Sequence, residues 1–206
     1  MIRTLELFAG TCSFSKVARE MGCETFTTDI DPRFDVDIIC DIMDYDPLQY
    51  IDPYIIWASP PCTTFSIASI SKHWKNNYIP KTIEAEQGLM ILNKTIEIIK
   101  YLSPRYFFIE NPRGMMRKVI SGLPKGTIRR TVTYCQYGAK YMKPTDIWTN
   151  CSEWIPRPIC KNGDTCHEKA PRGSKTGTQG IKNRINRSCI PYELCREILR
   201  TIINEL

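Results

Sequence analysis

The chain has 206 residues, ten of them cysteine, and a formal net charge of +6. This length suffices for one domain with a sizeable core, or for one domain with a small appendage. No run of eighteen apolar residues is present and the first residues form no apolar secretory region, which excludes a conventional membrane-spanning helix and argues against secretion. We therefore expect an intracellular protein whose cysteines stay reduced.

A strand, a glycine turn and a helix are predicted to open the chain. Residues 3–8 form the strand, Gly10 lies in the turn, and residues 12–21 form an amphipathic helix that ends at Gly22. This arrangement is typical of the place where a parallel sheet receives a cofactor that contains a nucleoside. The turn has one glycine and is therefore not a dinucleotide-binding fingerprint. The plain alternative is an ordinary connection between a strand and a helix.

Two further predicted strands, residues 24–29 and 37–40, are each associated with an acid. Asp29 ends the first of these strands, and Asp41 follows the second. A carboxylate at the end of a parallel strand is well placed to accept hydrogen bonds from ribose hydroxyls. Each aspartate could equally serve only to begin a turn.

The most informative motif follows the fourth predicted strand, residues 54–58. Pro60 and Pro61 force the backbone out of the sheet and leave Cys62 on a rigid corner. A thiolate held there is a nucleophile, although cysteine is also a common structural residue. We expect the polar and aromatic stretch that follows, residues 69–80, to form a mobile loop.

A long helix, residues 82–102, is predicted to end before Pro104. The next strand, residues 105–109, is aromatic and delivers Glu110 to its tip. A carboxylic acid in a sheltered site can donate a proton to a substrate. The plain alternative for Glu110 is a helix cap or a solvated loop residue.

Strands at residues 129–134 and 146–149 complete the pattern. The alternation of strands and helices predicts an α/β fold with a doubly wound, mostly parallel sheet and helices on both faces. We assign residues 1–150 to a catalytic and cofactor-binding domain. Residues 188–206 are expected to form a C-terminal helix that packs back on this domain, with Pro191 at its start.

Residues 151–187 form the third expected unit, a small, loop-rich and basic insert. They contain eight Lys or Arg residues against three acids, a balance suited to the phosphates of a nucleic acid. The alternative is a solvated loop without a partner. Four side chains of the insert could hold a zinc ion that stabilises it, or could be unrelated groups on loops: Cys151, Cys160, Cys166 and His167.

Together these motifs resemble the cytosine-C5 methyltransferases that use S-adenosylmethionine. The segments that carry the resemblance are Leu5–Gly10, Pro60–Ser66 and Glu110-Asn111, and it covers residues 1–150 well. It implies a Rossmann-like methyltransferase fold with a final antiparallel hairpin. It also implies a DNA methyltransferase similar to the compact enzymes of phages or proviruses and to the methyltransferases of restriction–modification systems.

The resemblance further implies a mechanism and a set of contacts. Cys62 adds to C6 of a flipped cytosine while Glu110 supplies a proton to N3, and C5 then receives the methyl group. Residues that resemble cofactor contacts are Phe8, Gly10, Asp29, Asp41 and Pro61. Residues that resemble contacts to the cytosine are Ser66, Asn111 and Lys143, with Lys143 and Thr145 standing where the family has an arginine pair.

Three other functions stay open at this point. An RNA cytosine-C5 methyltransferase would use the same chemistry, and nothing in the sequence excludes it. A catalytically weakened relative that only binds nucleic acid is favoured by the altered arginine pair and opposed by the intact Cys62 and Glu110. Ser59-Pro60-Pro61 superficially fits the loop of an amino-methylating enzyme, but Cys62 stands where those enzymes have an aromatic residue.

Overall fold

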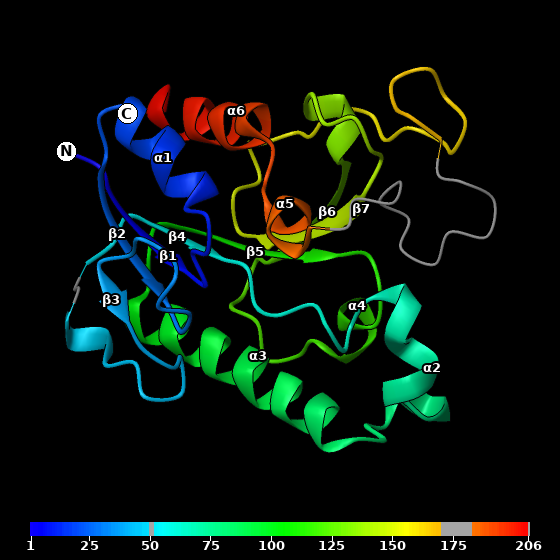
Figure 1. The fold of residues 1–206 in the computed structure, drawn as a ribbon. Coiled ribbons are helices and arrows are strands. Elements are labelled where there is room, and N and C mark those ends of the chain that lie inside the picture. The colour runs from blue at the N-terminus through cyan, green and yellow to red at the C-terminus, as the bar shows by residue number, and fades with distance from the viewer. Residues whose placement is uncertain (50–51, 170–182, 206) are drawn as a thin grey trace.

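The computed structural model describes residues 1–49, 52–169 and 183–205 (Figure 1). Its strands form one seven-stranded sheet and are β1 (Arg3–Leu7), β2 (Glu24–Asp29), β3 (Ile38–Ile39), β4 (Ile55–Ala58), β5 (Tyr106–Pro112), β6 (Ile128–Thr133) and β7 (Pro144–Thr149). Its α-helices are α1 (Ser13–Glu20), α2 (Ile70–His73), α3 (Ile83–Leu102), α4 (Met116–Val119), α5 (Arg184–Ser188) and α6 (Tyr192–Ile203).

The strand order is β3-β2-β1-β4-β5-β7-β6. Strands β1 to β5 are parallel, whereas β7 is antiparallel to both of its neighbours, β5 and β6. The order reverses between β1 and β4, so this is a doubly wound sheet with an antiparallel hairpin at one edge. The predicted α/β architecture, including that hairpin, is confirmed.

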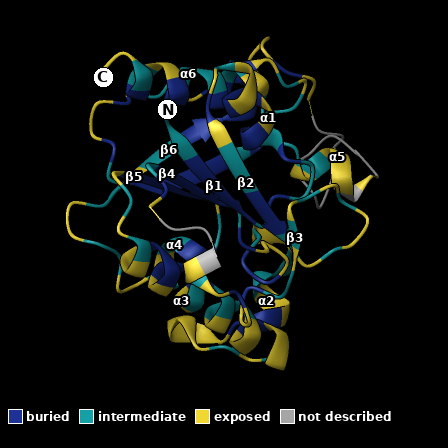
Figure 2. Cartoon of the chain, turned by 90° about the vertical axis from the view of Figure 1, so that its left-hand side faces the viewer, coloured by how far each residue is buried: buried dark blue, intermediate teal, exposed yellow. Residues whose placement is uncertain are grey.

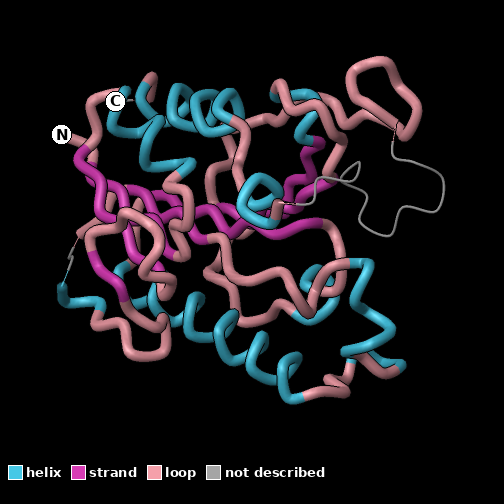
Figure 3. The backbone as a smooth tube through the Cα atoms, in the orientation of Figure 1, coloured by secondary structure: helices cyan, strands magenta, loops and turns pink. Residues whose placement is uncertain are grey.

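Alternating side chains of the central strands divide the core into two layers. Ile55 and Trp57 of β4 pack toward α1 and α6, while Ile56 and Ala58 pack toward α3 on the opposite face. Figure 3 shows the strands as a layer between these helices, and Figure 2 shows the buried strands with exposed outer helix faces. Because β4 is buried on both faces, its sequence is a continuous apolar run.

The long helix α3 begins and ends close to where the sequence predicts. The Thr82 hydroxyl accepts a hydrogen bond from the Ala85 amide at 3.3 Å and caps the N-terminus. Ser103 adopts a left-handed conformation at the other end, and Pro104 prevents continuation. No helix in the described ranges is long and apolar enough to cross a membrane.

The segment 69–80 differs from the expected loop. It contains α2 and a buried Trp74, whose indole N–H donates to the Thr64 carbonyl oxygen at 2.7 Å. His73 is buried as well, with Nδ1 2.8 Å from the Thr82 hydroxyl. The single turn of α2 is stabilised by these tertiary contacts, which periodicity in the sequence does not reveal.

The C-terminal helix α6 packs beside α1, on one face of the sheet (Figure 1). Trp154 anchors residues 151–169 to this helix, since its indole N–H donates to Glu197 at 3.2 Å. Residues 170–182 of the expected insert lie outside the described residues. The domain boundaries proposed from the sequence therefore stay predictions.

A buried acid in β1 caps the first helix. Glu6 accepts hydrogen bonds from the amides of Ser15 at 2.8 Å and Phe14 at 3.3 Å, at the N-terminus of α1. Burial, opposed by these hydrogen bonds, raises the pKa of Glu6 to about 7. Glu6 thus joins β1 to α1 and fixes the turn between them.

Candidate active site at the carboxyl ends of the strands

The candidate site lies at the carboxyl ends of β1, β4 and β5. Leu7 pairs with Ala58, so the turn after β1 and the loop after β4 leave the sheet side by side. Ala58 also pairs with Ile109, which places Glu110 beside the start of the β4 loop. In open parallel sheets, ligands bind in the crevice at such a reversal of strand order.

Backbone contacts shape the corner that carries Cys62. The Cys62 carbonyl oxygen accepts hydrogen bonds from the amides of Phe65 at 3.1 Å and Ser66 at 3.0 Å. Pro60 is buried, and its carbonyl oxygen accepts a hydrogen bond from the Asn111 side-chain amide at 2.8 Å. Cys62 itself is exposed. The loop after β4 is therefore tied to the tip of β5 while the thiol remains accessible.

A second set of contacts joins the β4 loop to the segment after β5. The Met115 amide donates to the Phe65 carbonyl oxygen at 2.7 Å, and Ser66 forms an isolated bridge with Gly114. A Cβ atom on Gly114 would lie 2.1 Å from that same oxygen, so no other residue fits there without movement. The close approach of the two segments depends on this glycine.

Ser66 and Asn111 each make contacts within the protein. The Ser66 hydroxyl lies 3.0 Å from the Ser69 hydroxyl. The buried Asn111 Oδ1 has no hydrogen-bond partner among the described residues. The predicted contacts of both residues with a substrate stay predictions, and so does a cofactor contact of the exposed Pro61.

Glu110 is buried at the end of β5, with 5% of its surface exposed. The Tyr134 hydroxyl donates to its Oε1 at 2.8 Å, and Lys143 Nζ lies 4.0 Å from the same oxygen. Burial and then the charge of Glu110 raise the pKa of Tyr134 well above its ordinary value, so the hydroxyl remains a donor. The carboxyl group is thus sheltered and oriented, as a proton donor needs to be.

Lys143 connects Glu110 to the C-terminal segment. Its ammonium group donates to the Arg187 carbonyl oxygen at 3.0 Å and lies 4.4 Å from the centroid of the Tyr134 ring. The side chain is buried, and its φ of +28° is unusual for lysine. Thr145 donates its hydroxyl hydrogen bond to the Lys143 carbonyl oxygen at 3.2 Å. A contact between Lys143 and a substrate stays a prediction.

The turn after β1 has an unusual backbone, with positive φ at Phe8, Gly10 and Cys12. Asp29 stabilises it, because its Oδ2 accepts a hydrogen bond from the Gly10 amide at 2.8 Å. The Asp31 amide donates to the other oxygen, Oδ1, at 2.9 Å. Each carboxylate oxygen has a second lone pair that can accept a hydrogen bond from a ligand. The structure thus brings Gly10 and Asp29 together.

Asp41 lies after β3 and is half-buried. Its Oδ1 accepts a hydrogen bond from the Met43 amide at 2.9 Å, and its carbonyl oxygen accepts one from the Asp44 amide at 3.0 Å. Asp41 therefore begins a turn, which is the alternative role that the sequence left open for it. A contact with a cofactor stays a prediction.

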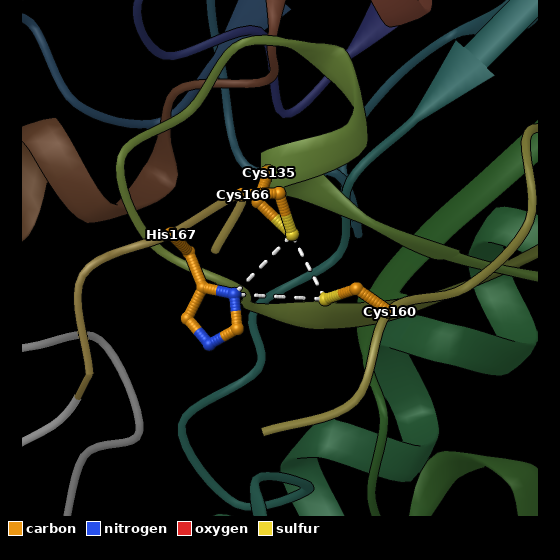
Figure 4. Close-up of side chains that lie close together, drawn as sticks. All are labelled: Cys135, Cys160, Cys166 and His167. Atoms are coloured by element: carbon orange, nitrogen blue, oxygen red, sulfur yellow. Dashed lines mark hydrogen bonds between the residues drawn. The ribbon is translucent and has the colours of Figure 1, made fainter. Parts of the chain in front are cut away.

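Four soft ligands converge beside the hairpin, but they are not the four expected from the sequence. The ligand atoms of Cys135, Cys160, Cys166 and His167 all lie within 4.8 Å of one another (Figure 4). Cys151 is instead fully buried in the hydrophobic core with α6, so its prediction as a ligand was wrong. The fourth ligand is instead Cys135, the second residue after β6. Burial and hydrogen bonds to the neighbouring thiols raise the pKa of Cys135 to about 12.

The expected basic surface is only partly described. Arg157 is held on α6, since its Nε donates to Glu197 at 2.7 Å, and its guanidinium lies 4.7 Å from the centroid of the Tyr137 ring. Arg172, Lys175 and Lys182 lie outside the described residues. A nucleic-acid surface in this segment stays a prediction.

Sequence reasoning missed an ion pair that supports the end of the sheet. Arg117 donates two hydrogen bonds to Asp146, at 2.6 and 2.8 Å, and the Thr131 hydroxyl donates a third at 2.8 Å. Asp146 is fully buried and pairs with Asn111 across β5 and β7. This pair therefore fixes the strand end next to Glu110. Arg117 and Asp146 are far apart in sequence, and no local motif signals their contact.

Residues 2–128 match the family model described as C-5 cytosine-specific DNA methylase. A curated relative, "Probable DNA (cytosine-5)-methyltransferase" of Frog virus 3 (isolate Goorha), is 32% identical over 174 residues, which is 80% of this chain and 78% of the relative. The match therefore covers most of both chains.

Two solved structures are similar in fold. One is described as a "putative DNA modification methyltransferase encoded within prophage" of E. coli; it is 14% identical, covers 78% of this chain and has a TM-score of 0.50. The other is the Dnmt2 methyltransferase of S. pombe, with 14% identity, 76% coverage and a TM-score of 0.51. The chain spans about half the length of these two proteins, at 52% and 53%.

Proposed function

The chain belongs to the C-5 cytosine-specific DNA methylase family, and from this premise we propose that it transfers a methyl group from S-adenosylmethionine to C5 of cytosine in DNA. One observation carries this proposal. Cys62 and Glu110 stand at the carboxyl ends of neighbouring parallel strands, and the Asn111–Pro60 hydrogen bond ties the two strand ends together. A nucleophile and a sheltered acid are thereby presented at the same end of the sheet.

The chemistry needs both groups. Cytosine C5 is a weak nucleophile until another group adds to C6. In the proposed reaction, the Cys62 thiolate forms a bond to C6, and the displaced electron pair makes C5 nucleophilic. Glu110 donates a proton to N3, which prevents negative charge from building up on the ring. After methylation, a water molecule takes the C5 proton, the thiolate leaves C6, and the N3 proton returns to Glu110, which restores the aromatic base.

The residues around the turn after β1 fit S-adenosylmethionine. Gly10, with φ of +48°, permits close approach of a ligand to the backbone, and Asp29 lies against it with acceptor capacity left. Phe8 offers an aromatic wall, while Asp41 and Pro61 complete the proposed contacts. When bound, the cofactor supplies a methyl group on a sulfonium ion. The protein's own part is to hold it beside the crevice.

The target base has to leave the DNA stack, at a cost of about a few kcal/mol. Lys143 and Ser66 are proposed to contact the extruded cytosine. Because Lys143 lies 4.0 Å from Glu110, it also balances the charge of the carboxylate. A lysine offers a point charge rather than the planar fork of arginine, so we expect base contacts that differ from those of an arginine pair.

Replacing Gly114 by alanine should displace the loop that carries Cys62. The new Cβ would clash with the Phe65 carbonyl oxygen at 2.1 Å, and relief of the clash requires the loop to move away from β5. We expect a loss of about 1–3 kcal/mol in the free energy of unfolding, measured in urea, and at least about 10²-fold in kcat. Gly126→Ala is the matched control, because its φ is +80° and nothing lies within 4 Å of the added Cβ. It should cost about 1–2 kcal/mol through backbone strain and leave kcat unchanged.

The proposed function is tested by the product formed. Purified protein is incubated with S-adenosylmethionine and either duplex DNA or transfer RNA, and the nucleosides are identified by mass spectrometry. C5-methylcytosine in DNA is the expected product, and bisulfite sequencing of DNA from expressing cells then gives the target site. C5-methylcytosine in RNA alone would assign an RNA enzyme, whereas N4-methylcytosine would refute the Cys62 mechanism.

A further inference from the structure

Three cysteines and a histidine from different segments point toward one another beside the β6–β7 hairpin (Figure 4). Cys135 lies in the turn after β6, whereas Cys160, Cys166 and His167 lie in the loop that follows β7. Cys135 Sγ is 3.0 Å from Cys160 Sγ and 3.6 Å from Cys166 Sγ. His167 Nδ1 is 3.8 Å from Cys160 Sγ and 3.5 Å from Cys166 Sγ.

Three of these four separations are close to the edges of a tetrahedron around a zinc ion. With Zn–S bonds of about 2.3 Å and a Zn–N bond of about 2.0 Å, tetrahedral geometry requires edges of about 3.8 Å between sulfurs and about 3.5 Å between sulfur and nitrogen. Three of the four distances lie within a few tenths of an ångström of these values. The fourth, 3.0 Å between Cys135 and Cys160, is shorter than an edge but far longer than a disulfide bond of about 2.05 Å.

The chemistry of the donors selects the metal. Three thiolates and one imidazole form a closed set of soft and borderline ligands, which suits a structural zinc site rather than a site for a hard cation such as Mg²⁺. Cys135, Cys160 and His167 are each at least nine-tenths buried, so the donors are sheltered from water. Of the two ring nitrogens of His167, Nδ1 is the one that faces the sulfurs.

The surrounding backbone already holds the ligand segments together. The Cys160 amide donates to the Thr133 hydroxyl at 3.1 Å, and the Glu168 amide donates to the Lys140 carbonyl oxygen at 2.8 Å. Arg157 adds a third link, donating to the Gln136 carbonyl oxygen at 2.7 Å. The four donors are therefore positioned by contacts that do not themselves need a metal.

We propose that Cys135, Cys160, Cys166 and His167 bind one Zn²⁺ ion that fastens residues 151–169 to the end of β6. The ion cross-links the hairpin turn to the loop, in a segment with few apolar residues of its own. Cys135 directly follows Tyr134, whose hydroxyl holds Glu110, so the metal also stabilises the turn behind the catalytic acid. The proposal does not depend on the methyl-transfer activity.

The test is the metal content of the full chain. Protein purified with a reductant and without chelators should contain about one zinc ion per chain by elemental analysis. Cys160→Ser and Cys166→Ser should each lower the content to below about 0.2 per chain and lower Tm by several degrees. Cys151→Ser and Cys189→Ser, which alter cysteines outside the cluster, should retain the zinc. Cys166 is exposed, so its replacement perturbs folding least.

A spectroscopic measurement covers the case in which the serine variants fail to fold. Wild-type protein loaded with Co²⁺ should show the strong red absorption of a tetrahedral ion and a sulfur-to-cobalt charge-transfer band, both removed by added zinc. The proposal is overturned by wild-type protein that takes up neither metal and melts at the same temperature with and without zinc. It is also overturned if Cys166→Ser retains a full zinc complement while Cys151→Ser loses it.

Discussion

Cys62→Ala is expected to abolish methyl transfer, with a loss of at least about 10⁴-fold in kcat. The reason is that no other group in the proposed mechanism can form the bond to C6 that makes C5 reactive. Because Cys62 is exposed at the corner of the β4 loop, its replacement should change Tm little. The measurement is transfer of a radiolabelled methyl group from S-adenosylmethionine to duplex DNA under single-turnover conditions.

A matched control for this variant is Cys23→Ala. Cys23 lies between α1 and β2, at the amino end of the parallel strands and so opposite the candidate site, and it is buried. Its replacement removes a thiol without approaching the site, so kcat should stay within about twofold. A Cys62→Ala protein that retained more than a tenth of the wild-type rate would remove the covalent step from the account.

Glu110→Gln is expected to lower kcat by about 10²–10⁴-fold. Glutamine has nearly the same shape and can still accept the hydrogen bond from Tyr134, but it has no acidic proton to give to N3. Binding of DNA, measured by fluorescence anisotropy, should change far less than the rate does. Such a separation of rate from affinity would mark Glu110 as a group that acts in the transition state.

The chain contains a fitting control for this second variant. Glu205 also accepts a hydrogen bond from a tyrosine hydroxyl, that of Tyr106, at 2.6 Å, but at the far end of β5. Glu205→Gln should leave kcat unchanged. Tyr134→Phe, which removes only the donor to Glu110, should have an intermediate effect of about 10-fold. Equal losses for the Glu110 and Glu205 variants would indicate that the first effect is only structural.

Much of the sheet could be predicted from local patterns. Each of the strands predicted at residues 3–8, 54–58 and 129–134 is found within two residues of its expected ends. Residues 54–58 are an apolar run that ends at two prolines, whereas residues 3–8 and 129–134 mix apolar or β-branched residues with polar ones and are followed by a glycine within four residues. The segment 69–80 was misjudged because its polar sequence contains two buried residues, His73 and Trp74, whose hydrogen-bond partners Thr82 and Thr64 lie outside the segment.

Sequence patterns predicted the residues that carry the chemistry themselves. They did not predict residues whose role depends on a contact made only in the folded chain. Cys62 follows β4 and Glu110 lies in the last part of β5, so the topology of the sheet places both residues. Tyr134 and Cys135 became relevant only through the hairpin, which brings them to Glu110 and to Cys160 across a gap of 24 and 25 residues. Cys151 was chosen as a ligand by its nearness in sequence, whereas folding places it in the core.

The central claim is that the sulfur of Cys62 becomes bonded to C6 of the target cytosine. It is tested most directly by intact-protein mass spectrometry after incubation with S-adenosylmethionine and duplex DNA containing 5-fluorocytosine, from which the C5 substituent cannot be removed. We predict a stable adduct whose mass equals protein plus methylated DNA strand, with the attachment mapped to the peptide that contains Cys62. Methylation of ordinary DNA by the same preparation, with no adduct on the fluorinated DNA or with an adduct at another residue, would contradict the account.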